Sequence, residues 1–219
     1  MKKFNDRGPC FRQVHYMADI SDKIEEITEL VDGGDYFVIS KPRQYGKTTT
    51  LCVLAQTLKD RYDCLDISFE TSLEEDFDSS ANFFAYIKRK FVDNLKELAE
   101  TEAAKCLEGT ELLKLLDLSD AISAFINRCS KPVVLMVDEV DAGTDHKIFI
   151  KFLSLLRDKF INRGKKGEIT FQSVILAGLR DVTKLKPEIK KESAIPPDDE
   201  HVSPWNIATQ FKVDMSLGY

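Results

Sequence analysis

The apolar residues of this chain follow two patterns that alternate along its length. Short apolar runs predict strands at 36–40, 64–69, 133–137 and 173–177, and an alternating pattern predicts a fifth strand at 211–217. Apolar residues at helical spacing predict helices at 20–31, 48–62, 81–99, 110–128 and 149–160. Because strands alternate with helices, we expect an α/β fold with a mainly parallel sheet that helices cover on both faces.

One stretch near the carboxyl end differs from the rest in composition. Residues 184–204 contain prolines at positions 187, 196, 197 and 204, a basic cluster and then three consecutive acidic residues. A loop of this length is usually functional, and the alternative is a solvated connection. We expect residues 1–35 to form a segment and helix that precede a core domain at 36–219.

The junction between the first predicted strand and the next helix has the layout of a phosphate-binding loop. The segment VISKPRQYGKTTTLCVL (38–54) places Gly46, Lys47 and Thr48 between an apolar strand and an apolar helical pattern. Backbone N–H groups at such a helix start point at a β-phosphate. The Lys47 ammonium would reach the β- and γ-phosphates, and the Thr48 hydroxyl would bind Mg²⁺. Gly46 is needed where the backbone comes too close to phosphate for a Cβ.

The loop departs from the pattern G-x-x-x-x-G-K-[ST] at its first position, where Lys41 stands in place of glycine. Pro42 is expected to supply the bend that this glycine normally allows. Positive charge on Lys41 and Arg43 would face the triphosphate, and the alternative is a basic turn that joins strand to helix. The residues expected to bind the nucleotide in this loop are Pro42, Arg43, Gln44, Tyr45, Gly46, Lys47, Thr48 and Thr49.

A pair of carboxylates ends the third predicted strand, KPVVLMVDEVD (131–141). Carboxylates at the tip of a buried strand are costly unless a cation or water needs them. We expect Asp138 to hold Mg²⁺ together with Thr48, and Glu139 to polarise the attacking water. The alternative is that both residues cap the next helix. Asp141 and Asp145 are interpreted as local turn or cap residues.

The fourth predicted strand, within FQSVILAGLRDV (171–182), leads to a basic residue. At this strand end Arg180 is a candidate for a γ-phosphate sensor or an arginine finger. The alternative is a surface ion pair with Asp181 or Glu188.

Composition narrows the functional classes. The chain has 219 residues, of which 43% are hydrophobic, and a net charge of −6, so it does not carry the basic footprint of a nucleic-acid-binding protein. Its five cysteines indicate neither a zinc site nor a disulfide framework, and three of them fit apolar patterns as small core residues. No apolar run approaches the length of a membrane span. We therefore expect a cytoplasmic protein.

Five segments of the chain together resemble the bacterial AAA-like P-loop ATPases, which are related to archaeal-type and signal-transduction ATPases. The matching segments are FNDRGPCFRQVHYM (4–17), KPRQYGKTTTL (41–51), PVVLMVDEVD (132–141), FQSVILAGLRDV (171–182) and SPWNIATQFKVDMSL (203–217). They span nearly the whole chain in order. The Lys-Pro-Arg opening of the loop is similar to the version found in that family.

The resemblance implies a three-layer P-loop NTPase fold with a five-stranded sheet, and with the strand before the loop in its centre. It implies Mg²⁺ and ATP or ADP as ligands, with Lys47, Thr48, Asp138 and Glu139 in the roles given above. It also suggests that Tyr16 stacks near the nucleotide base, although a packed Tyr16 fits the sequence as well. In the family a helical lid follows the last strand. The sequence stops at Tyr219, so we expect either that the lid is absent or that this sequence is a fragment of a longer protein.

The leading functional hypothesis is an ATP-hydrolysing domain, and the alternative is a nucleotide-gated switch with little hydrolysis that regulates a larger effector protein. A GTPase is disfavoured because an N-K-x-D motif is missing from the sequence. An arginine acting across a subunit interface would require a homo-oligomer. The protein partner is not defined by the sequence.

Overall fold

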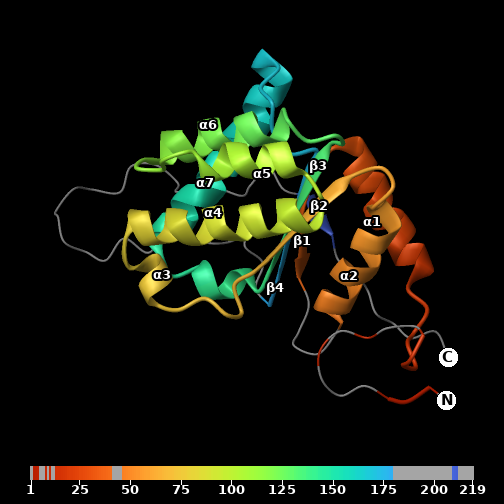
Figure 1. The fold of residues 1–219 in the computed structure, drawn as a ribbon. Helices are drawn as coiled ribbons and strands as arrows, with labels where there is room; N and C mark the ends of the chain where they lie inside the picture. The colour runs from red at the N-terminus through yellow and green to blue at the C-terminus, as the bar shows by residue number, and fades with distance from the viewer. Residues whose placement is uncertain are drawn as a thin grey trace, which may run out of the picture.

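A parallel β-sheet forms the middle layer of the computed structural model, which describes residues 2–4, 8, 10, 13–40, 46–179 and 209–211 (Figure 1). Within these residues the strands lie in the order β2-β3-β4-β1-β5. Their bounds are β1 (Tyr36–Ser40), β2 (Asp63–Ser68), β3 (Val133–Asp138), β4 (Ser173–Gly178) and β5 (Thr209–Phe211). All pairings between these strands are parallel, as the alternation of strands and helices predicts.

The expectation of a five-stranded sheet with the loop strand in its centre is met in part. Four strands contain five or six residues each, whereas β5 contains three. Strand β1 is an interior strand between β4 and β5, but the middle position belongs to β4. The predicted strand at 211–217 overlaps β5 only at Phe211, because residues 212–219 lie outside the described part of the chain, as do residues 184–204.

Helices lie against both faces of the sheet (Figure 1). Their bounds are α1 (Ser21–Gly33), α2 (Lys47–Leu58), α3 (Glu75–Asp78), α4 (Ser80–Glu97), α5 (Thr101–Glu108), α6 (Leu115–Ile126) and α7 (Lys147–Lys166), with a 3-10 turn η1 (Val140–Gly143). Helices α3 and α5 were not expected from the sequence. None of the helices in the described residues has the length and apolar character that crossing a bilayer requires.

Alternate residues of the strands divide the core into two clusters. Apolar residues of α1 and α2 pack against one face of the sheet, which consists of Phe37, Ile39, Val134, Met136, Ile175 and Ala177. Residues of α4, α5, α6 and α7 pack against the other face, which consists of Tyr36, Val38, Leu65, Ile67, Val133, Leu135, Val137, Val174 and Leu176. Because each strand is covered on both faces, β1, β3 and β4 are continuous apolar runs.

The turn between α1 and β1 requires a glycine. Gly34 has a φ of 77°, a left-handed conformation that is common just after a helix, and its N–H donates to the carbonyl oxygens of Leu30 and Val31. A Cβ at Gly34 would lie 3.1 Å from the guanidinium of Arg163. That guanidinium donates to the Gly34 carbonyl at 2.7 Å and to the Gln172 carbonyl at 2.9 Å. One arginine of α7 therefore ties the start of β1 to the start of β4.

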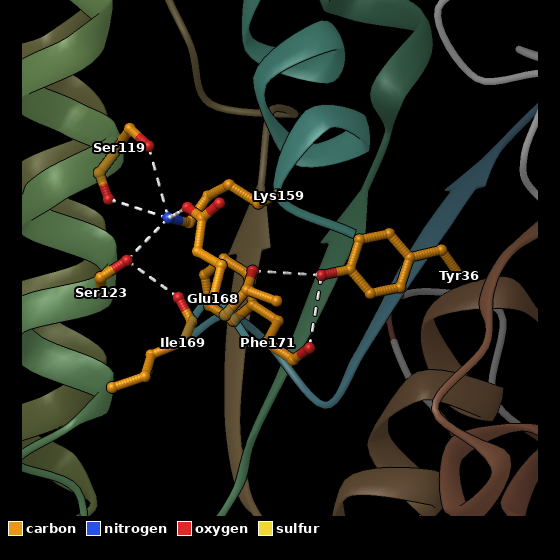
Figure 2. Close-up of polar contacts among 8 residues, drawn as sticks. Tyr36, Ser119, Ser123, Lys159, Glu168, Ile169 and Phe171 are labelled. Carbon is orange, nitrogen blue, oxygen red and sulfur yellow. Dashed lines mark hydrogen bonds and ion pairs between the residues drawn. The ribbon is translucent and has the colours of Figure 1, made fainter. Parts of the chain in front are cut away.

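A buried lysine joins α6, α7 and the loop before β4 (Figure 2). The side chain of Lys159 is 2% exposed, and its ammonium donates to the Ser123 hydroxyl at 2.7 Å and to the Ser119 carbonyl at 3.1 Å. It also forms an ion pair of 2.5 Å with Glu168, whose side chain is 26% exposed. The Ser123 hydroxyl donates in turn to the Ile169 carbonyl. This polar group holds α7 to α6 and to the loop before β4.

The same loop contacts β1 through a buried phenol (Figure 2). The Tyr36 hydroxyl donates to the Phe171 carbonyl at 3.3 Å and lies 3.3 Å from the Thr170 hydroxyl. Burial raises the pKa of Tyr36 to about 12, so the phenol stays neutral and keeps its donor.

We predict that Lys159→Met lowers the free energy of unfolding by about 3 kcal/mol. Methionine keeps the length of the apolar stem, but Glu168 loses its cation, and breaking a buried ion pair from one side costs about 3–5 kcal/mol. We expect the low end of this energy range, because the Glu168 side chain remains partly exposed to water. Urea unfolding followed by circular dichroism measures the loss.

The matched control is Lys151→Met, because Lys151 lies on the exposed side of the same helix. Exposed substitutions usually change stability by less than about 0.5 kcal/mol. Equal unfolding midpoints for the two variants would show that the Lys159 ion pair adds nothing to stability.

Candidate functional site

The parallel register brings the carboxyl ends of β1, β3 and β4 to one edge of the sheet. Ser40 at the end of β1 pairs with Gly178 at the end of β4, and Asp138 at the end of β3 pairs with Ser68 at the end of β2. Ligands of open parallel sheets bind at this edge. The residues that follow these strands are therefore the first candidates for a site.

The amino end of α2 lies at this edge. Gly46 precedes the helix with a φ of 75°, a left-handed conformation that favours glycine. Lys47 is the first helical residue and is only 5% exposed. The first N–H groups of a helix have no acceptor within the helix, so this end attracts an anion. The Gly46-Lys47-Thr48 segment therefore has the local geometry that its sequence predicts.

A hydrogen bond joins the helix start to the end of β3. The Thr48 hydroxyl donates to Oδ2 of Asp138 at 2.7 Å. The other carboxylate oxygen, Oδ1, accepts the backbone N–H of Glu139 at 2.9 Å. Asp138 is 4% exposed, so it is a buried carboxylate with both oxygens held in place. A hydroxyl and a carboxylate this close are oxygen ligands of the kind that Mg²⁺ prefers.

Glu139 stands next to this pair in an unusual conformation. Its φ is 53°, so a non-glycine residue occupies the left-handed region just before η1. Its carboxylate lies 4.0 Å from the ammonium of Lys47, and its side chain is 31% exposed. Such a strained residue is typical of functional sites. The two carboxylates that the sequence paired therefore differ, since Asp138 is buried and fixed whereas Glu139 faces the open side.

Asp141 makes a long-range contact that the sequence interpretation missed. It was expected to act within a local turn, and its carbonyl does accept the Thr144 N–H. Its carboxylate, however, accepts the backbone N–H of Leu179, just beyond β4. A Cβ on Gly178 would lie 2.7 Å from the same carboxylate and would clash. Asp141 therefore ties the end of β4 to the turn after β3.

A pocket of about 1230 Å³ opens over these residues. This volume exceeds the roughly 300–1,000 Å³ typical of small-ligand sites. Lys47, Thr48 and Glu139 line it, and Gly8 and Cys10 bring the amino-terminal segment to the same wall. The Cys10 N–H donates to the Thr49 hydroxyl oxygen at 3.0 Å. The pocket is thus lined by Lys47 and Thr48 of the predicted phosphate-binding loop and by Glu139 of the predicted acidic pair, whereas Asp138 is not among its described lining residues.

The wall opposite the helix start was not expected from the sequence. It includes Glu74 and Phe77 from the segment after β2, and His146 from the start of α7. The His146 ring stacks on Phe77 with a centroid distance of 4.3 Å, and its Nε2 lies 3.9 Å from the Glu74 carboxylate. These residues carry no short motif. Only their contacts across the fold bring them to the pocket.

Tyr16 lies away from the described wall of the pocket. Its side chain is 52% exposed, and its ring contacts Phe4 with a centroid distance of 5.0 Å. Backbone hydrogen bonds between Lys3 and the neighbouring residues Val14 and Tyr16 hold this segment together. Tyr16 is not among the described residues that line the pocket.

Several predicted site residues lie outside the described part of the chain. They are Pro42, Arg43, Gln44 and Tyr45 of the loop, and Arg180 after β4. The site as described consequently consists of the amino end of α2, the carboxyl end of β3, and the walls that face them.

Comparison with known proteins supports the architecture. No protein-family model matches the chain. No curated protein matches it either. Among the solved structures that it resembles is a Walker-type ATPase of Pyrococcus abyssi, with a TM-score of 0.52 and 12% sequence identity. The match covers 83% of this chain and 49% of that one, so the chain spans about half the length of its structural neighbour. The likeness shows the fold of this chain alone, an α/β architecture in which helices cover a parallel sheet.

Proposed function

We propose that this protein binds ATP with Mg²⁺ and hydrolyses it to ADP and phosphate. The observation that carries the proposal is the 2.7 Å hydrogen bond between Thr48 and Asp138, next to the buried ammonium of Lys47. A cation, a hydroxyl and a carboxylate at a helix start are the groups that a Mg²⁺-triphosphate requires. The solved structure of similar fold is itself named as an ATPase.

The triphosphate would lie over the amino end of α2. Lys47 would neutralise the β- and γ-phosphates, and the N–H groups of the first turn would bind the β-phosphate. Thr48 and Asp138 fit a Mg²⁺ ion, because the Thr48 hydroxyl lines the pocket and is hydrogen-bonded to a carboxylate oxygen of Asp138. The bound ion supplies charge neutralisation on the phosphates. Pro42, Arg43, Gln44, Tyr45 and Thr49 complete the proposed loop.

Glu139 would act on the attacking water. Its carboxylate is near Lys47 yet partly exposed, so it can face a water molecule at the end of a triphosphate. It would orient this water and accept its proton as the bond to the γ-phosphorus forms. Lys47 would leave its contact with Glu139 for the phosphates. That exchange frees the carboxylate as a base only when nucleotide is bound.

The same exchange supports the second candidate, a nucleotide-gated switch. The contact between Lys47 and Glu139, at 4.0 Å, links α2 to the segment after β3, and phosphate binding would replace it. Lys47 would then contact Glu139 in the empty site and the phosphates in the occupied site. Such a change of contacts can signal that nucleotide is bound without any hydrolysis. In this case the chain would act as the regulatory part of a larger effector protein.

Three finer assignments belong to the same proposal. Arg180 would contact the γ-phosphate as a sensor, or reach a neighbouring subunit of a homo-oligomer as an arginine finger. Tyr16 would stack on the nucleotide base, since its ring is half exposed, but the ring would have to leave its contact with Phe4 and reach the pocket wall that contains Cys10. Of these roles only the arginine finger would require a protein partner, a second copy of this chain.

We predict that Lys47→Ala weakens ATP binding by at least tenfold, or about 1.4 kcal/mol. The substitution removes the buried cation that faces the β- and γ-phosphates. Calorimetry in Mg²⁺ buffer measures the affinity. Lys59→Ala is the matched control, because Lys59 is exposed at the other end of the same helix. Unchanged affinity for Lys47→Ala would rule out the phosphate-binding role of α2.

We predict that Asp138→Asn weakens ATP binding in Mg²⁺ much more than in EDTA. The amide keeps the shape of the side chain but loses the charge that a cation requires. The exposed Asp60 provides the control variant Asp60→Asn, whose affinity should equal that of the parent protein in each buffer. Equal losses for Asp138→Asn under both conditions would mean that its role is only structural.

We predict that Glu139→Gln keeps ATP binding but lowers the rate of cleavage by roughly 10²- to 10⁴-fold, the usual worth of a general base. Single-turnover measurements with protein in excess detect even slow cleavage. Glu74→Gln is the control, because Glu74 lines the same pocket but its side chain is 90% exposed. Cleavage by Glu139→Gln at the parental rate would favour the nucleotide-gated switch.

A further inference from the structure

Two carboxylates and a thiol converge at the edge of the sheet opposite the nucleotide pocket. The side chains of Asp63, Glu100 and Cys129 each place one potential metal-binding atom within 4.8 Å of the other two. Asp63 is the first residue of β2, so it lies at the amino end of the strand whose other end faces the pocket. We call these three residues the Asp63 cluster.

Three separate connections of the fold create this cluster. The Asp63 N–H donates to the Pro132 carbonyl at 3.0 Å, which fixes the start of β2 beside the start of β3. Glu100 follows Ala99, whose φ of 61° turns the chain sharply between α4 and α5. Cys129 lies in the turn between α6 and β3. The cluster therefore joins β2, the α4–α5 turn and the α6–β3 turn.

Asp63 is a buried carboxylate that hydrogen bonds satisfy only in part, through the Lys131 backbone and Glu100. It is 3% exposed, and in the part of the chain that the structure describes its Oδ2 has no hydrogen-bond partner. Buried polar atoms in native proteins almost always have a partner, and unpaired buried charge is costly. Burial and the neighbouring charge of Glu100 raise the pKa of Asp63 to about 6. A group that supplies positive charge at Oδ2 would remove this cost.

Glu100 cannot supply this positive charge, because it is itself a carboxylate. Burial acts to raise the pKa of Glu100, but hydrogen bonds from the Ser130 hydroxyl and backbone N–H outweigh burial and hold that pKa below its ordinary value. Glu100 thus brings a second negative charge close to Asp63, and a cation between the two carboxylates would relieve their repulsion.

Cys129 completes a set of ligands. Its Sγ contacts the Phe125 carbonyl at 3.4 Å, and burial raises the pKa of the thiol to about 12, so the group is protonated when no cation is near. A coordinating metal ion deprotonates a thiol, and the proton passes to solvent. Metal binding would then place two carboxylates and one thiolate around one ion.

We propose that the Asp63 cluster is a binding site for a divalent transition-metal ion of the zinc(II) type. A thiolate among the ligands favours zinc over magnesium or calcium, which prefer oxygen ligands only. Tetrahedral zinc with bonds of roughly 2.0–2.3 Å places its ligand atoms about 3.3–3.7 Å apart, which lies within the spacing of the cluster. Water would occupy the fourth position.

Charge is balanced at the proposed site. Two carboxylates and one thiolate carry three negative charges, and the ion supplies two positive ones. Lys131 lies near both carboxylates and lowers the pKa of each through its positive charge. Its ammonium donates to the Lys59 carbonyl at 2.8 Å, which holds it at this edge of the sheet. The ion would cross-link the start of β2, the α4–α5 turn and the α6–β3 turn. It would therefore stabilise the fold whether or not nucleotide is bound.

Cobalt(II) is a suitable probe, because a thiolate bound to cobalt absorbs in the near ultraviolet by charge transfer. The full chain, first treated with a chelator and exchanged into chelator-free buffer, is titrated with cobalt(II). We expect one equivalent to produce this absorption and zinc(II) to displace it. Cys129→Ser should abolish the band. Cys106→Ser is the matched control, since Cys106 is a similarly part-buried cysteine outside the cluster, and it should keep the band.

A second variant separates this site from the nucleotide pocket, which also contains a cysteine. Cys10→Ser should keep the band, because Cys10 lies by Thr49. A band lost in Cys10→Ser and kept in Cys129→Ser would overturn the proposal, as would the absence of any thiolate band in the parent protein. In that last case the two carboxyl groups share a proton instead.

Thermal unfolding provides a readout that does not depend on cobalt. Zinc(II) should raise the unfolding temperature of the parent protein and of Glu102→Gln, an exposed neighbour on α5. It should not do so for Glu100→Gln, which keeps the shape of the side chain. An equal rise for Glu100→Gln would assign the zinc effect to another part of the protein and overturn the site.

Discussion

Parallel strand register is the constraint on which the rest of this structure depends. Because β1, β3 and β4 run in the same direction, whatever follows them in sequence must meet at one edge. This brings Thr48 to within hydrogen-bonding distance of Asp138, although the two residues are far apart in the chain. The strands can be apolar throughout because helices cover both faces, so polar groups are concentrated at the two edges.

Those edges carry different chemistry. At the carboxyl edge, Lys47, Thr48, Asp138 and Glu139 combine one cation with oxygen ligands beside an open pocket. At the amino edge, Asp63 is closed in by Glu100 and Cys129. The first arrangement suits an exchangeable, hydrated ligand, and the second suits an ion that stays. Under the two proposals, the open pocket would let nucleotide exchange, and the buried Asp63 would retain its ion.

Much of the fold follows from sequence because local patterns determine it. Strands β1, β3 and β4 were predicted almost to the residue, since buried parallel strands are short apolar runs bounded by polar residues. Helix α5 was missed because eight residues give too short a pattern between two longer helices. Strand order was expected only from family resemblance, and β4 rather than β1 proved to be the middle strand, because pairing is decided by contacts between distant segments.

The candidate sites show the same difference between features that local sequence predicts and features that only contacts between distant segments create. Gly46-Lys47-Thr48 and Asp138-Glu139 are short motifs, so their sequence identified them before any contact was known. The bond from Leu179 to Asp141, the wall formed by His146, and the Asp63 cluster have no such signature. Each is assembled from single residues on separate connections. The cysteines in particular indicated no zinc site, because they include no close pair, and their spacing carries no information on a site with mixed ligands.

The backbone conformation of Glu139 has a consequence for how this chain can change over generations. A left-handed non-glycine residue costs roughly 1–2 kcal/mol, and glycine would be free of that cost. Stability alone therefore favours loss of the carboxylate at this position. In descendants whose pocket is no longer under selection, we expect glycine to replace Glu139. Asp138 would be retained longer, because its hydrogen bonds to Thr48 and to the backbone stabilise the fold.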